Sequence, residues 1–79
     1  MNQEIAEEIL ADIENCFENE SRDDQDKVIS IEVITGHEYK SHIADVHAYP
    51  AYLFCVSDYG CTVQGLYIPY DKILCMAIR

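Results

Sequence analysis

The sequence predicts a small, mostly β fold of the α+β class, with an N-terminal α-helix followed by a five-stranded, antiparallel, strongly bent barrel. Apolar residues recur with a helical period through residues 1–20 and with a period of two from residue 27 onward. The strands predicted by the second pattern are short and are joined by tight turns, and barrel closure would protect their edges from aggregation. A chain of 79 residues is one domain, divided here into a helix (1–20), a connector (21–26) and a barrel (27–79).

The N-terminal segment is predicted to be an amphipathic helix. At about 100° per residue, its apolar side chains fall within one wedge, comprising Ile5, Ala6, Ile9, Leu10, Ile13, Cys16 and Phe17. Acidic residues occupy the opposite side, and Asn2 is suited to capping the first turn. Residues 21–26 contain no apolar side chain, which predicts a solvated connector.

The remaining residues predict five strands. These are residues 28–35, 38–46, 51–57, 61–68 and 73–78, with turns at residues 35–37, 58–60 and 69–72. The third strand is apolar on both faces, which predicts a central position or one wrapped in the barrel. Gly65, inside the fourth strand, predicts a bend or a close approach of another group.

The negative charge is concentrated in the first third of the chain. Residues 1–26 carry ten acids and one base, a net charge of −9, whereas residues 27–79 carry five acids and four bases. A net charge of −10 disfavours direct binding to nucleic acid, because that affinity comes from cations that neutralise phosphates. It also disfavours an anionic membrane surface. The predicted partner is therefore a basic protein surface, and nucleic-acid-binding proteins carry such surfaces.

Two groups of residues are the candidate contact residues. The first is acidic and lies on the helix and connector: Glu7, Glu8, Glu14, Glu18, Asp23 and Asp24. The second is the set of tyrosines that fall in predicted turns, where packing does not require them: Tyr49, Tyr59 and Tyr70. The other three tyrosines, Tyr39, Tyr52 and Tyr67, are expected to be residues of the barrel wall.

No pattern indicates catalysis, a metal or a cofactor. The four cysteines form no Cys-x-x-Cys pair, and the three histidines are five residues apart, which matches no metal-site spacing. The cysteines are expected to be small buried apolar residues in a reducing compartment. The acidic start lacks the features of a signal peptide, and no apolar run approaches about 20 residues. We therefore expect a cytoplasmic, non-enzymatic protein.

The run ITGHEYKSHIADVHAYPAYLFCV, followed by SDYGCTVQGLYIPYDKILCMAI, resembles the two halves of a Sm-like (LSm/Hfq-like) domain. Gly36 matches the glycine of that family's first hairpin, Asp45 lies near its strand-two acid, and IPYDKI resembles the turn before its last strand. The resemblance covers residues 5–78 and implies a small SH3-like barrel. Two positions depart from the RNA-binding members. Ala48-Tyr49-Pro50-Ala51 replaces their loop asparagine, and Tyr70-Asp71-Lys72 replaces their basic element.

Within this superfamily, the length and the acidic leader resemble the Rof-like inhibitors of the transcription terminator Rho. That resemblance implies an acidic helix and a Sm-like barrel that bind the basic RNA-binding surface of Rho. Two alternatives remain. One is a self-assembling ring joined through the last two strands, as in many Sm-like proteins. The other is direct RNA binding through the pore of such a ring, which the charge disfavours.

Overall fold

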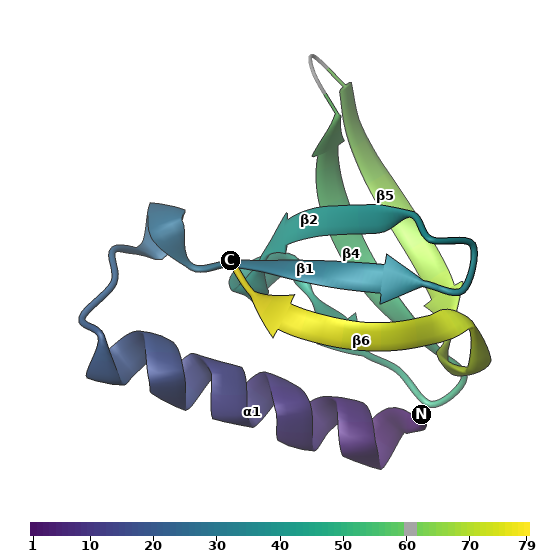
Figure 1. Cartoon of the computed structure of the whole chain (residues 1–79), viewed down its shortest axis with the longest axis horizontal. Coiled ribbons are helices and arrows are strands. Elements are labelled where there is room, and N and C mark those ends of the chain that lie inside the picture. Colours follow the sequence, from purple (N-terminus) through teal and green to yellow (C-terminus); the bar gives the residue numbers. More distant parts are fainter. Residues whose placement is uncertain (60–61) are drawn as a thin grey trace.

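The computed structural model describes residues 1–59 and 62–79, without the side chains of Asp58 and Tyr59, and its order of elements is a helix followed by strands (Figure 1). The helix is α1 (Gln3–Asn19), and three single 3₁₀ turns are η1 (Asp24–Asp26), η2 (Ile43–Asp45) and η3 (Tyr70–Lys72). The strands are β1 (Val28–Val33), β2 (Glu38–His42), β3 (His47–Ala48), β4 (Tyr52–Tyr59), β5 (Thr62–Pro69) and β6 (Ile73–Ile78). The prediction of an N-terminal helix and a mostly β body is confirmed.

Helix α1 begins at a side-chain cap and packs one narrow stripe against the body. The Asn2 side chain accepts a hydrogen bond from the backbone N–H of Ile5 at 2.9 Å, which satisfies one of the free donors of the first turn. Ala6, Ile13 and Phe17 are buried, and Ile9 and Leu10 pack partly against the core. Two residues of the predicted apolar wedge, Ile5 and Cys16, are exposed, so the buried stripe is narrower than the wedge.

The C-terminal end of α1 is closed by two backbone hydrogen bonds. Arg22 N–H donates to Phe17 C=O, and Ser21 N–H donates to Glu18 C=O, which is the Schellman pattern. Ser21 has a φ of 55°, the left-handed conformation that this motif requires at that position. The chain then passes through the connector and η1 into β1.

The strands form two three-stranded antiparallel sheets. Sheet A has the order β2-β1-β6, and sheet B has the order β3-β4-β5. Strand β1 is central in sheet A, and its residues Ile29, Ile31 and Val33 are buried, as their alternation predicts. Strand β4 is central in sheet B, which confirms the central position expected for the strand apolar on both faces.

The prediction of five strands in one closed barrel is wrong in its count, and the described residues do not form a closed barrel. The predicted strand 38–46 is β2 interrupted by η2, and the additional strand β3 lies just beyond its predicted end. Ile43 and Val46 are both buried although they are three residues apart, a spacing that an extended strand cannot place on one face. The single turn η2 does so, and it carries the chain from sheet A to sheet B.

The turns agree in part with the prediction. Gly36 has a φ of +88° in the β1–β2 turn, a conformation that glycine adopts without strain. The expected one-turn connector before the last strand is η3. Asp58 and Tyr59 belong to β4, and the predicted turn residue Gly60 lies outside the described residues.

The core lies between the two sheets and the buried face of α1. Its largest fully buried side chains are Phe17 from the helix, Ile29 and Ile31 from β1, and Leu53 and Cys55 from β4. Helix α1 contacts strands of both sheets, so its position is fixed against the whole β body. In Figure 1 it runs beside β6, with one long side turned away from the strands.

Candidate protein-binding surface

The acidic residues of the leader are all exposed. We call them the acidic surface: Glu4, Glu7, Glu8, Asp12, Glu14, Glu18 and Glu20 on or just after α1, and Asp23, Asp24 and Asp26 in the connector. All six acidic residues that the sequence singles out as contact candidates belong to this set. Their role in binding stays a prediction, but their exposure meets its first structural requirement.

Few of these carboxylates are neutralised. Arg22 Nε pairs with Glu20 at 2.7 Å, and Lys27 Nζ pairs with Asp24 at 3.0 Å. Within the described parts of the chain, the other eight acids of this surface take part in no ion pair. Eight unpaired negative charges on one helix and its connector create a strong local field that attracts cations and repels phosphate groups.

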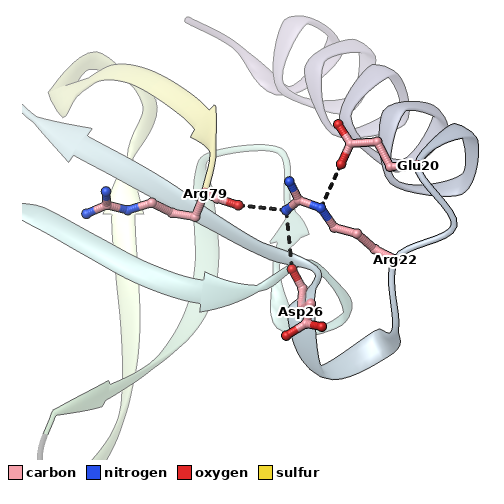
Figure 2. Close-up of polar contacts among 4 residues, drawn as sticks. All are labelled: Glu20, Arg22, Asp26 and Arg79. Carbon is pink, nitrogen blue, oxygen red and sulfur yellow. Dashed lines mark hydrogen bonds and ion pairs between the residues drawn. The ribbon is translucent and has the colours of Figure 1, made fainter.

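Arg22 connects the end of the acidic helix to the end of the chain (Figure 2). Its Nη1 donates to the backbone C=O of Arg79 at 2.6 Å and to that of Asp26 at 3.3 Å. Its guanidinium carbon also lies 4.9 Å from the ring centroid of Phe17. Arg22, the single base of the first 26 residues, therefore links the end of the helix to the connector and to the last residue of the chain.

A cleft of about 270 Å³ lies between the last turns of α1, η1 and η2. Phe17, Ile43 and Ala44 supply apolar atoms to its lining. Its charged lining residues are Glu14, Glu18, Asp24 and Lys27. The structure thus brings three of the predicted contact acids together at one cleft.

The three candidate tyrosines have different environments. Tyr49 is 44% exposed and stays a candidate contact residue, whereas the Tyr59 side chain lies outside the described part of the chain. Tyr70 is buried, and its hydroxyl donates a hydrogen bond to the backbone C=O of Tyr49. The prediction that Tyr70 is a surface contact is therefore wrong, because its ring is needed to fill the core beneath η3. Burial, and secondarily the nearby Glu7 carboxylate, raises the pKa of its hydroxyl.

The sequence analysis missed an aromatic row on the outer face of sheet B. The rings of Tyr49 and Tyr52 are 5.5 Å apart, those of Tyr52 and Tyr67 are 5.4 Å apart, and those of Phe54 and Tyr67 are 5.0 Å apart. Tyr67, expected in the barrel wall, is 67% exposed. The signal was present in the alternation of β4, where Tyr52, Phe54 and Val56 interleave with the buried residues Leu53, Cys55 and Ser57. We call Tyr49, Tyr52, Phe54 and Tyr67 the aromatic row.

The described cysteines and histidines form no chemical site. Cys16, Cys55 and Cys75 are free thiols, and the expectation of buried cysteines is wrong for Cys16 and Cys75, which are exposed. Burial raises the pKa of Cys55 to about 11, which keeps it protonated and unreactive near neutral pH. No three histidine, cysteine or acidic side chains in residues 1–59 and 62–79 are arranged to hold a metal ion. Over the same residues, no helix has both the length and the apolar character required to span a membrane. Comparison with family models, curated proteins and solved structures gave no match to this chain.

Proposed function

We propose that this protein is a non-enzymatic regulator that acts in the cytoplasm by covering a basic, nucleic-acid-binding surface of a partner protein. The observation that carries the proposal is the acidic surface, with eight exposed and unpaired carboxylates on a helix packed against the β body and on the connector that follows it. Negative charges displayed at intervals along a helix can replace the phosphates that such a partner normally binds. The partner would then lose access to its nucleic acid by competition.

The most specific form of this proposal is Rof-like inhibition of the transcription terminator Rho. It is supported by the order of a leading helix and short strands, and by the partition of these strands into β2-β1-β6 and β3-β4-β5. If β2, η2 and β3 are counted as one bent strand, the chain has the five strands of the Sm-like layout proposed from the sequence. The segregation of charge onto the leader supports the same assignment.

The proposal is tested by competition on purified Rho that carries a labelled single-stranded RNA. The protein is expected to displace the RNA, which fluorescence anisotropy measures. Displacement is expected to weaken above about 0.15 M salt, where the electrostatic screening length falls below roughly 8 Å. The variant E8K/E14K is expected to lose most of this activity. The matched control D45K/D71K changes the net charge equally but alters exposed acids of η2 and η3. Displacement that is equally strong for both variants would remove the acidic surface from the mechanism.

A lysate capture separates the general proposal from the Rho assignment. If the protein fails to displace RNA from Rho but captures a different basic protein, with and without nuclease, the Rof-like assignment is wrong and the acidic-regulator proposal stands. If E8K/E14K captures the same protein as the wild type at physiological salt, both the Rof-like assignment and the acidic-regulator proposal are wrong.

A second candidate function is self-assembly through the last two strands. Strands β5 and β6 are outer strands of their sheets, and neither has a second strand partner among the described residues. Both carry exposed apolar side chains, including Val63 and Tyr67 on β5 and Leu74 on β6. Unpaired edges of this kind can join two chains by strand addition. Light scattering decides the matter, because a monomer at micromolar concentration excludes a ring.

A further inference from the structure

The aromatic row places neighbouring rings on one face of sheet B. The antiparallel register aligns His47 with Phe54 and Phe54 with Tyr67, so these side chains share one face of sheet B. That face is the outer one, because the alternate residues Leu53 and Cys55 are fully buried. A Cβ at Gly65 would lie 3.3 Å from the Phe54 ring, so the missing side chain leaves room for that ring beside β5.

The aromatic row begins beside the acidic helix. The Gln3 side chain in the first turn of α1 donates to the backbone C=O of Ala48, next to Tyr49. Tyr70, whose hydroxyl donates a hydrogen bond to the Tyr49 backbone, lies close enough to Glu7 for that carboxylate to raise the pKa of the hydroxyl. The N-terminal half of the acidic surface and the first ring of the row therefore adjoin each other.

We propose that the aromatic row is the second half of the partner-binding surface and that it receives the planar guanidinium groups of arginine side chains on the partner. The inference rests on the proposed function, which makes the partner basic, and it adds that the partner's contact residues there are arginines rather than lysines. A guanidinium is weakly hydrated and stacks on aromatic faces, whereas an ammonium is strongly hydrated and does so less readily. The adjoining carboxylates would bring the cations to the rings.

The charges of the molecule favour arginine over the other class of ligand that stacks on tyrosine, the bases of single-stranded nucleic acid. Binding of a single strand needs a positively charged groove along its backbone. Three of the five bases, Arg22, Lys27 and Arg79, are engaged in ion pairs, and over the described residues this leaves Lys40 and Lys72. Lys72 lines a cleft together with Tyr67, but one lysine at the row and one on β2, against eight unpaired acids, do not make such a groove.

The test uses two defined peptides of equal length and charge, one of alternating arginine and glycine and the other of alternating lysine and glycine. At about 0.15 M salt, the wild-type protein is expected to bind the arginine peptide roughly three- to tenfold more tightly, as measured by calorimetry. The variant Y52L/Y67L is expected to lose this preference and to keep its affinity for the lysine peptide. The control L74A removes an exposed apolar side chain of β6, outside the row, and is expected to keep the preference. Circular dichroism checks that each variant is folded.

Each outcome decides between the two proposals. Equal wild-type affinity for the two peptides, or a preference that survives in Y52L/Y67L, overturns the arginine inference and leaves the acidic-surface proposal standing. Failure of both peptides to bind overturns both. A single-stranded oligonucleotide that binds more tightly than the arginine peptide, and loses affinity in Y52L/Y67L, assigns the row to nucleic acid. A wild-type dimer that Y67L converts to a monomer assigns it to a second copy of the chain.

Discussion

Tyr70, in the turn η3 between β5 and β6, ties the turn between β3 and β4 to the core. Its ring fills the core and its hydroxyl donates to the Tyr49 backbone C=O. Tyr70→Phe keeps the ring and removes the hydrogen bond, so we expect the free energy of unfolding to fall by about 1 kcal/mol. Thermal denaturation should show a midpoint lowered by roughly 4–8 °C, as expected for a domain of this size. An unchanged midpoint would mean that water replaces the hydroxyl without cost.

Cys55 makes stability depend on pH in the alkaline range. Burial raises its pKa from 9.0 to about 11, so the unfolded chain releases this proton at lower pH than the folded chain. The free energy of unfolding should therefore fall as the pH rises from about 9 to about 11, by up to roughly 2–3 kcal/mol. Urea titrations of the wild type and of Cys55→Ala measure it. Tyr70 adds a loss of the same sign above pH 10, so the Cys55→Ala curve should be shallower but not flat.

The burial of some single side chains could be predicted from the sequence, and that of others could not. The alternation of β1 correctly predicted the burial of Ile29, Ile31 and Val33, because one face of a strand must meet the core. Tyr70 was assigned to the surface and is buried, whereas Tyr67 was placed in the barrel wall without a face being assigned and proves to be exposed. Tyrosine is compatible with both a core and a surface, and only the packing of η3 and the open edge of β5 separate the two environments.

At the level of elements, the C-terminal end of α1 contains one residue that is not suited to its backbone conformation. Ser21 adopts a φ of 55° at the position where a Schellman motif usually has glycine. A side chain in this conformation costs roughly 1–2 kcal/mol, and glycine avoids that cost but loses more entropy on folding. Ser21→Gly is therefore expected to raise the free energy of unfolding by about 0.5–1 kcal/mol in urea titrations. A destabilised variant would contradict this account of the helix end.

The same helix end depends on Arg22. Its guanidinium joins Glu20, the Asp26 backbone and the Arg79 backbone, and stacks on Phe17. Arg22→Gln removes the charge and most of these contacts, so we expect faster hydrogen exchange in the last two turns of α1 and no change at the centre of β1. Lys40→Gln, which removes an exposed charge of β2, is the matched control. Equal exchange rates in the wild type and the Arg22 variant would show that apolar packing alone holds the helix end.

Element boundaries were predictable where one periodicity covered the whole element. The helix cap at Asn2 and the last strand, residues 73–78, agree with the sequence analysis. The interruption of the predicted strand 38–46 by η2, with a further strand β3 after it, was not predicted, because one half-polar strand and two strands joined by a turn have almost the same composition. Only the burial of both Ile43 and Val46 distinguishes them.

For the whole molecule, the central feature is a charged helix fixed on a nearly neutral β body. The charge division was evident from the sequence, and the structure adds that the carboxylates are exposed and mostly unpaired. Only part of the aromatic row could be foreseen: the alternation of β4 places Tyr52 and Phe54 on one face, but the addition of Tyr49 and Tyr67 depends on a register that the sequence does not give. Long-range register is set by the assembled sheets and not by local pattern.

The most direct test of the central claim is an amide chemical-shift map of the isotopically labelled protein, titrated with its captured partner or with the arginine peptide. The account predicts that the perturbed amides lie in residues 4–26 and along the outer face of sheet B. It also predicts that addition of salt reverses the shifts in residues 4–26 first, because ion screening weakens exposed charges more than stacked rings. Shifts confined to β1, β2 and β6, with α1 unchanged, would contradict it.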